Sequence, residues 1–283
     1  GGERYLLTLV ATLAAQGWQT GLLWDHKPIH RLAQTKFNLD LGHTAYLPTY
    51  HFTHSIAHKI SFMQKFDLAF IVSDGSIPLM AAKQNILHFQ VPFHDIKGRK
   101  LANQLKKHSI HHFVANSHFT KDIVDDEYGI NCKVIYPPID VRGFHAARKQ
   151  NIILYVARFS NLLQSKGHSE VIQAFKQLYD SGTKNYRLWL AGSTEVGSQQ
   201  IIKQLRAEAK GYPIEITLNP PYSDVQELFS IAKYFWAAAG YNVSETQQPE
   251  KCEHFGITTV EAMASGCVPL AVRKGGFREI IQH

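Results

Sequence analysis

Two glutamates near the end of the chain have a spacing that suits the binding of a ligand with several hydroxyl groups. Glu253 and Glu261 are separated by seven residues, and Gly256 lies in the loop before a helix expected over 258–264. The first N–H groups of a helix have no partner within it and can bind an anion. Glu253 precedes this start and Glu261 lies about two turns away, so we expect them to contact different parts of one ligand, such as a sugar and a vicinal ribose diol. Taken alone, the spacing is more often that of an amphipathic helix with two solvated glutamates.

Short apolar runs alternate with helical patterns along the whole chain. The runs are apolar throughout and do not alternate between apolar and polar residues, which is typical of parallel strands covered on both faces. They are expected at 18–24, 67–73, 85–90, 111–115, 133–136, 151–157, 186–192, 214–218, 234–240 and 268–272. The helices are expected at 3–16, 117–127 with Ser117 as N-cap, 168–179, 199–209, 224–232 and 258–264. This alternation predicts an α/β fold with right-handed crossovers.

A candidate domain boundary lies at Pro137-Pro138 and the polar stretch 142–150, because a proline pair continues neither a sheet interior nor a helix. We expect two Rossmann-like domains, residues 1–145 and 150–283, whose parallel sheets face a cleft that binds the ligand. A helical pattern directly follows Gly1-Gly2, and a second helical pattern has not ended when the sequence reaches His283. We therefore expect elements to be missing at both ends.

Several segments resemble the signatures of one enzyme family. The segment EHFGITTVEAMASGCVP, which contains both glutamates, is similar to the E-G-F-G-x-x-x-x-E-A-M-A-x-G-x-P signature of retaining family 4 (group 1) glycosyltransferases of the GT-B fold. Residues 1–4 (GGER), 116–140, 155–168 and 275–281 (GGFREII) resemble further family segments, in the right order. The EHFG variant resembles the mannosyltransferases that elongate lipid-linked oligosaccharides, and their bacterial relatives.

The resemblance implies a hexosyltransferase, with mannose among the candidate sugars. Such an enzyme moves a hexose from a GDP- or UDP-sugar to a glycan or lipid-linked acceptor, with retention of configuration. The first domain would lie on the acceptor side, and the second would bind the nucleotide sugar. The implied catalytic residues are Arg158, Lys166 and Glu253, and the implied donor-binding residues are these three with Gly1, Gly2, His254, Phe255, Gly256, Ile257, Thr258 and Glu261.

Arg158 and Lys166 would hold the diphosphate, since a guanidinium binds oxygens bidentately and an ammonium is a compact charge. Cations and helix-start amides there stabilise the negative charge that develops on the leaving diphosphate. The resemblance thus implies no metal or other cofactor, and the chain has no D-x-D-type pair near these residues to argue for one. The spacing of His51, His54 and His58 could place them on one helical face, but without identifiable cysteine or carboxylate ligands we predict no metal site.

The sequence departs from the family pattern in three places. The spacing between Arg158 and Lys166 is longer than usual, which leaves the role of Lys166 open. Residues 241–252 form a longer link than in most relatives. This segment either contributes to the selection of the donor or acceptor, or is a solvated loop. Where the family often has a histidine two residues before a proline, this chain has Gln90, with His88 two positions earlier. We expect one of these two to face the cleft.

Composition excludes several classes of protein. Of the 283 residues, 45% are hydrophobic and 19% charged, which excludes a disordered or collagen-like chain. No apolar run reaches the roughly 18 residues of a membrane span, and no signal-peptide pattern is visible. Three cysteines without a C-x-x-C spacing fit reduced thiols. We therefore expect a cytoplasmic location, with peripheral attachment to the cytoplasmic face of a membrane as a further expectation.

The net charge of +7 suits phosphate-bearing partners. A basic nucleic-acid-binding protein is the alternative from a different class, but no RNP-like strand or zinc finger supports it, and we expect no nucleic-acid partner. Another GT-B enzyme, such as an epimerase or phosphorylase, and an inactive relative are the nearer alternatives. An NAD-dependent oxidoreductase is disfavoured because no G-x-G-x-x-G follows a strand.

Overall fold

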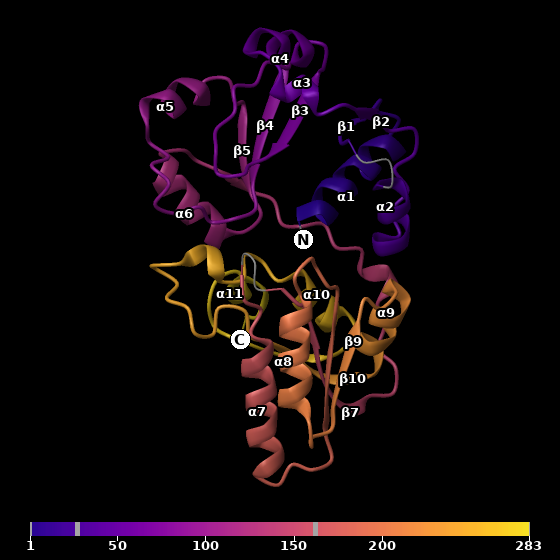
Figure 1. The fold of residues 1–283 in the computed structure, drawn as a ribbon. Helices are drawn as coiled ribbons and strands as arrows, with labels where there is room; N and C mark the ends of the chain where they lie inside the picture. The colour runs from indigo at the N-terminus through magenta and orange to yellow at the C-terminus, as the bar shows by residue number, and fades with distance from the viewer. Residues whose placement is uncertain (1, 26–28, 161–163, 283) are drawn as a thin grey trace. The chain divides into compact units, whose positions relative to one another are not determined.

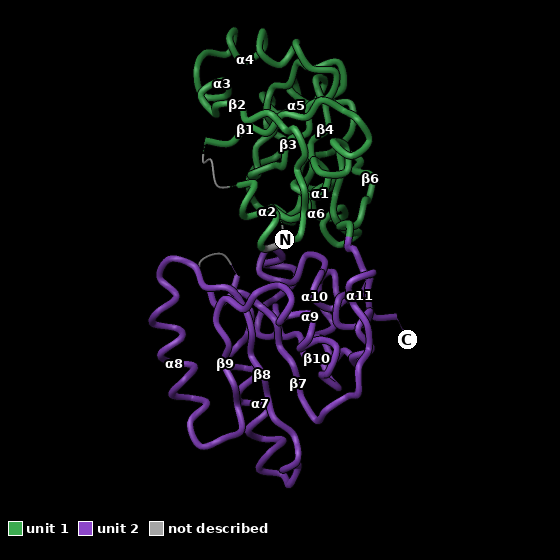
Figure 2. The backbone as a smooth tube through the Cα atoms, turned by 90° about the vertical axis from the view of Figure 1, so that its right-hand side faces the viewer, with its two compact units in different colours: residues 1–138 green, residues 139–283 purple. Residues whose placement is uncertain are grey.

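The chain is divided into two compact units. The computed structural model describes residues 2–25, 29–160 and 164–282. Unit 1 comprises residues 1–138 and unit 2 residues 139–283, so the division directly follows Pro137-Pro138 (Figure 2). In both units the described strands pair in parallel, and helices lie in most of the connections between them. The expected α/β fold with parallel sheets is confirmed.

Unit 1 contains two parallel sheets (Figure 1). The smaller sheet pairs β1 (Gly21–Leu23) with β2 (Ala45–Leu47), and the larger has the order β3 (Leu68–Val72), β4 (Gln84–Phe89), β5 (His112–Ala115) and β6 (Lys133–Val134). The helices are α1 (Gly2–Ala15), α2 (Ile29–Phe37), α3 (Tyr50–Thr53), α4 (Ile56–Met63), α5 (Leu101–Lys107) and α6 (His118–Tyr128). Phe89 of β4 and Tyr128 of α6 are fully buried in a core that the larger sheet and α6 share.

Local signals explain where some of these elements begin and end. The Ser117 hydroxyl accepts the N–H of Thr120 at 3.0 Å, so the predicted serine cap at the start of α6 is confirmed. The strand expected at 18–24 is restricted to β1, which pairs with β2 over three residues. The elements between 29 and 63 were not predicted, because this histidine-rich stretch has no continuous apolar run of strand length.

Unit 2 is built on one five-stranded parallel sheet. Its order is β11 (Val268–Ala271), β10 (Ala232–Ala237), β7 (Gln150–Val156), β8 (Arg187–Gly192) and β9 (Ile214–Leu218). Counted along the chain this is 5-4-1-2-3, the strand order of a Rossmann-type unit. The connecting elements are α7 (His168–Asp180), α8 (Gln199–Ala209), α9 (Tyr222–Ile231), α10 (Ile257–Ala264), α11 (Phe277–Ile280) and two short 3₁₀ turns, Val141–Gly143 and Pro249–Lys251.

The central strand β7 is covered on both faces. Ile152 and Leu154 belong to a buried cluster with α9 and α10, whereas Ile153 and Tyr155 belong to a second buried cluster with α7 and α8. This two-sided burial explains why 151–157 is a continuous apolar run. α7, which follows β7, and α10, which follows β10, therefore pack on opposite faces of the sheet.

Candidate functional site

The strand order of unit 2 creates a place where loops from neighbouring strands converge. β7 pairs with β8 on one side and β10 on the other, and all three are parallel. Their carboxyl ends therefore lie at the same edge, and the order reverses between β7 and β10. Ligands of open α/β sheets bind at such a reversal, outside the carboxyl ends of the strands.

Two of the predicted residues meet at this edge. Lys166 follows β7 and Glu253 follows β10, and the Lys166 Nζ lies 3.1 Å from the Glu253 Oε2. Their side chains are only 16% and 21% exposed. Gln164 strengthens the junction, since its Oε1 accepts from the Lys166 Nζ at 2.5 Å and its amide donates to the carbonyls of Lys251 and Cys252. The loops after β7 and β10 are thus joined by side-chain contacts.

The ion pair sets the charge state of Glu253. Burial by itself raises the pKa of this carboxyl, but the positive charge of Lys166, its hydrogen bond and the charge of His254 outweigh burial, and the net pKa lies below its ordinary value. Glu253 is therefore a carboxylate at neutral pH. A largely buried ammonium beside a carboxylate can bind both an anion and hydroxyl groups.

Arg158 is held by a carboxylate that the sequence analysis did not identify. Its Nη1 lies 2.5 Å from the Glu195 Oε1, and its side chain is half exposed. Glu195 follows β8, so the pairing of β7 with β8 brings the two together. A hydrogen bond from Ser160 and the charge of Arg158 hold the pKa of Glu195 below its ordinary value against the effect of burial. The position of Glu195 just beyond a strand end was the only sequence signal for it.

The predicted helix start is present. α10 begins at Ile257, directly after Gly256, and its first residues Ile257 and Thr258 are partly exposed. Glu261 lies within α10 and is 4% exposed, so a ligand could contact only a small part of it.

The residues between the ion pair and α10 are packed into the fold. Phe255 is buried, and the His254 Nε2 donates to the carbonyl of Glu250 at 2.9 Å.

The backbone at Glu253 is fixed by two glycines of the GGFREII segment. A Cβ on Gly275 would lie 2.2 Å from the Glu253 carbonyl oxygen, and one on Gly276 would lie 2.5 Å from that of His254. The Gly276 N–H donates to the Glu253 carbonyl at 2.8 Å. Only glycine permits so close an approach between two chain segments.

Residues 241–252 are tied to the same glycine segment. The Lys274 Nζ donates to the carbonyls of Gly240, Tyr241 and Val243, at 3.2, 3.0 and 2.7 Å. Glu245 accepts from the Gly275 N–H and pairs with Arg278. These contacts argue against a freely solvated loop, which was one of the two alternatives for this segment.

In unit 1, His88 and Gln90 differ sharply in accessibility. His88 is fully buried at the end of β4, with its ring 4.2 Å from that of Tyr5, and burial lowers its pKa to about 4. Gln90 is only partly buried and its Nε2 lies 3.3 Å from the His88 Nδ1. A Cβ on Gly2 would meet the Gln90 side chain at 2.5 Å, so Gln90 lies beside the start of α1. Gly1 lies outside the described residues.

The histidines of α3 and α4 do not form a recognisable metal site. The His51 Nδ1 and His58 Nε2 lie 2.9 Å apart with stacked rings. Within the described ranges, no group of three or more His, Cys, Asp or Glu side chains could hold a metal ion. Nor does any helix in the described part of the chain have the length and apolar character to cross a membrane.

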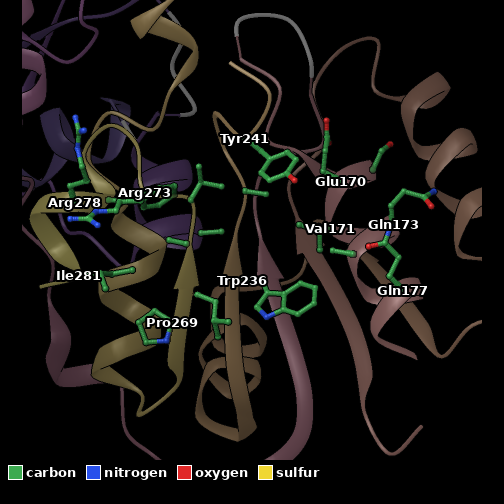
Figure 3. A pocket seen from close by; sticks show the side chains of 18 of the residues that line it. Glu170, Val171, Gln173, Gln177, Trp236, Tyr241, Pro269, Arg273, Arg278 and Ile281 are labelled. Atoms are coloured by element: carbon green, nitrogen blue, oxygen red, sulfur yellow. The ribbon is translucent and has the colours of Figure 1, made fainter. Parts of the chain in front are cut away.

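A hollow of unit 2 lies on the sheet face rather than beside the ion pair. It encloses about 1,310 Å³. Figure 3 shows Trp236 and Pro269 facing it from the sheet, with Val171 of α7 on one side and Arg273 and Ile281 on the other. Neither Lys166 nor Glu253 lines it. This groove is therefore separate from the loop junction, the place where side chains join the loops after β7 and β10.

Comparisons with known proteins identify the family to which the chain belongs. Residues 140–283 match the sequence model of the family described as glycosyl transferases group 1. The chain belongs to this family, so the predicted membership of the group 1 glycosyltransferases is confirmed.

Similar proteins include enzymes named GDP-Man:Man(3)GlcNAc(2)-PP-Dol alpha-1,2-mannosyltransferase. The protein from Xenopus laevis is 28% identical over 158 residues, covering 50% of this chain and 29% of its own. The protein from Dictyostelium discoideum is 24% identical over 179 residues, covering 58% and 33%. The chain thus spans about a third of the length of these relatives. Among solved structures, the sucrose-phosphate synthase of Thermosynechococcus elongatus, a GT-B glycosyltransferase, superposes with a TM-score of 0.67 at 14% identity, covering 100% of this chain and 78% of its own.

The Lys166–Glu253 pair makes a testable contribution to stability. Glu253→Gln should lower the free energy of unfolding at pH 7 by about 1–3 kcal/mol, because the partly buried ammonium loses its charged acceptor. The pKa of Glu253 is lowered in the folded protein, so this contribution is complete above the ordinary value of 4.5 and is lost as the pH falls through the lower folded pKa.

Urea unfolding at a series of pH values measures this effect. The difference in the free energy of unfolding between wild type and Glu253→Gln should stay constant from pH 7 to about 5 and should shrink in more acid solution. Glu227→Gln, an exposed change on α9, serves as the control and should show no such difference. A difference that grows on acidification would contradict the lowered pKa.

Proposed function

We propose that this chain binds a nucleotide diphosphate sugar at the carboxyl ends of β7, β8 and β10 and transfers its hexose, with retention of configuration, to a hydroxyl group of a glycan or lipid-linked acceptor. The observation that carries the proposal is the Lys166–Glu253 contact, which joins two loops at the reversal of strand order within the family-matching segment. GDP-mannose is the first candidate donor, because the mannosyltransferases similar to this chain are named for it. UDP-sugars are the second.

In this proposal the cations act on the leaving group. The bond between the sugar C1 and the diphosphate breaks, and negative charge builds on the phosphate oxygen. The acceptor hydroxyl oxygen forms the new bond to C1 on the same face of the ring and gives its proton to that departing phosphate oxygen. Lys166 and Arg158 stabilise that charge without a metal ion. Arg158 exchanges Glu195 for the diphosphate, which a half-exposed arginine can do at small cost.

The remaining donor contacts follow from the α10 region. Glu253 accepts hydrogen bonds from sugar hydroxyls, and the accessible part of Glu261 accepts from the ribose. The amides of Gly256, Ile257 and Thr258 contact phosphate oxygens at the start of α10. His254 and Phe255 shape the loop between them.

Unit 1 is proposed to provide the acceptor side. Gln90, rather than the buried His88, is its candidate contact, and it lies beside Gly2 at the start of α1. A cytoplasmic location is also part of the proposal, supported by three cysteines that are buried and unpaired.

A ligand panel tests the proposed donor class. GDP, UDP, ADP and their sugars are compared by thermal shift with single-stranded RNA as the competing ligand. A ligand at 100 times its Kd stabilises the fold by about 2.7 kcal/mol, so a GDP or UDP compound should raise the melting temperature by several degrees. Stabilisation by RNA alone would favour the nucleic-acid alternative instead.

Arg158→Ala tests the proposed role of the arginine in catalysis. Loss of one donor to the developing charge should lower turnover about 10²–10³-fold, while KM for the nucleotide sugar changes much less. Initial rates over a range of donor concentrations up to saturation measure both values, with an acceptor found by screening. Arg187→Ala is the matched control, because Arg187 pairs with Glu215 where β8 begins, at the opposite edge of the sheet. Wild-type turnover in Arg158→Ala would refute the role.

A further inference from the structure

Helix α5 of unit 1 turns its leucines outward. Leu101 and Leu105 are 76% and 67% exposed, and they lie four residues apart on one side of the helix with the exposed Ala102 between them. A surface helix ordinarily packs its apolar stripe against the core and exposes its polar residues. In α5 this arrangement is reversed.

The polar side of α5 holds the helix in place. The Lys107 Nζ donates to the carbonyls of Tyr128 and Gly129 at 3.1 and 2.9 Å, and the Gln104 amide donates to Tyr128 at 3.5 Å. These carbonyls lie at the end of α6, where they have no partner within that helix. The Asn103 amide donates to the Gly98 carbonyl at 3.0 Å. Because hydrogen bonds anchor α5 inward, its leucine side is left for another contact.

The surroundings of the leucines are positively charged. The sequence from 96 to 121 contains no Asp or Glu. Lys97 and Lys100 are exposed and Lys106 is partly exposed, and within residues 2–25, 29–160 and 164–282 the side-chain ammonium group of none of the three makes a hydrogen bond or an ion pair.

The nearby acidic side chains are engaged elsewhere. The Glu127 carboxylate accepts the N–H groups of Asp95 and Gly98, at 3.1 and 2.8 Å. Asp126 pairs with Arg99 at 3.3 Å. Residues 95–107 contain five Lys and Arg and one Asp, so with Asp126 and Glu127 included the net charge beside the leucines is still positive.

We propose that the α5 face, formed by Leu101, Ala102, Leu105, Lys97, Lys100 and Lys106, docks onto an anionic lipid membrane. Two leucines on a short helix offer too little area for a stable protein–protein interface, which buries about 1,200–2,000 Å². The same two side chains suit shallow insertion at the boundary between headgroups and acyl chains, while the lysines contact anionic headgroups. This surface belongs to unit 1 and is argued independently of the proposed donor site.

Vesicle co-sedimentation tests the proposal with the protein as it is. The chain should bind vesicles of phosphatidylcholine mixed with phosphatidylserine or phosphatidylglycerol, whose anionic headgroups create a negative surface potential, and should bind pure phosphatidylcholine weakly. Salt at about 0.5 M should weaken the binding, because it screens the lysines.

Two variants separate the apolar and the charged contributions. Leu101→Gln/Leu105→Gln should weaken vesicle binding roughly tenfold for each leucine. Lys97→Gln/Lys100→Gln/Lys106→Gln should weaken it on the order of 100-fold, at about fivefold per lysine. The matched controls are Val196→Gln, which changes a 95% exposed side chain of unit 2, and Lys203→Gln/Arg206→Gln/Lys210→Gln, an α8 variant at exposed positions of that helix and its C-cap. Circular dichroism and melting temperature verify that each variant is folded.

The outcomes are distinct. Loss of binding in both α5 variants, with binding retained in both controls, supports the proposal. Equal loss in the α8 variant would show that net charge alone drives binding and would overturn it. Self-association that the leucine variant abolishes, without any vesicle binding, would assign the face to a second copy of the chain. Failure of vesicle binding leaves the donor site untouched, because nucleotide binding is measured separately.

Discussion

The contact between Lys166 and Glu253 depends on the order in which the strands of unit 2 pair. β7 lies between β8 and β10, so the segments that leave these strands end at the same edge of the sheet. A partly buried ammonium and a partly buried carboxylate each cost free energy without the other, and the pair therefore holds the two loops together. Gly275 and Gly276 complete this constraint by allowing a third segment to approach the Glu253 backbone.

The edge of the sheet carries a second ion pair with a different character. Arg158 and Glu195 are more exposed than Lys166 and Glu253, and their contact joins the loops after β7 and β8. An exposed ion pair contributes little to stability, so it can be exchanged for a ligand more readily than the inner pair. In the proposed enzyme, the inner pair shapes the site and Arg158 responds to the diphosphate.

The sequence predicted unit 2 better than unit 1, for a physical reason. The run 151–157 is continuously apolar because β7 is covered on both faces, and such runs are easily recognised. The stretch 29–63 mixes aromatic, histidine and polar residues without one period, and its helices were missed. Glu195 was missed because its pairing with Arg158 depends on the alignment of β7 with β8. The ties of 241–252 to Lys274 likewise depend on contacts between distant segments that no local pattern encodes.

Hydrogen–deuterium exchange with and without GDP or UDP tests most directly whether the nucleotide binds at the loop junction of unit 2. The account predicts slower exchange in 157–167 and 252–258, the segments that carry Arg158, Lys166, Glu253 and the start of α10. Protection confined to 268–282, beside the groove on the sheet face, would contradict it.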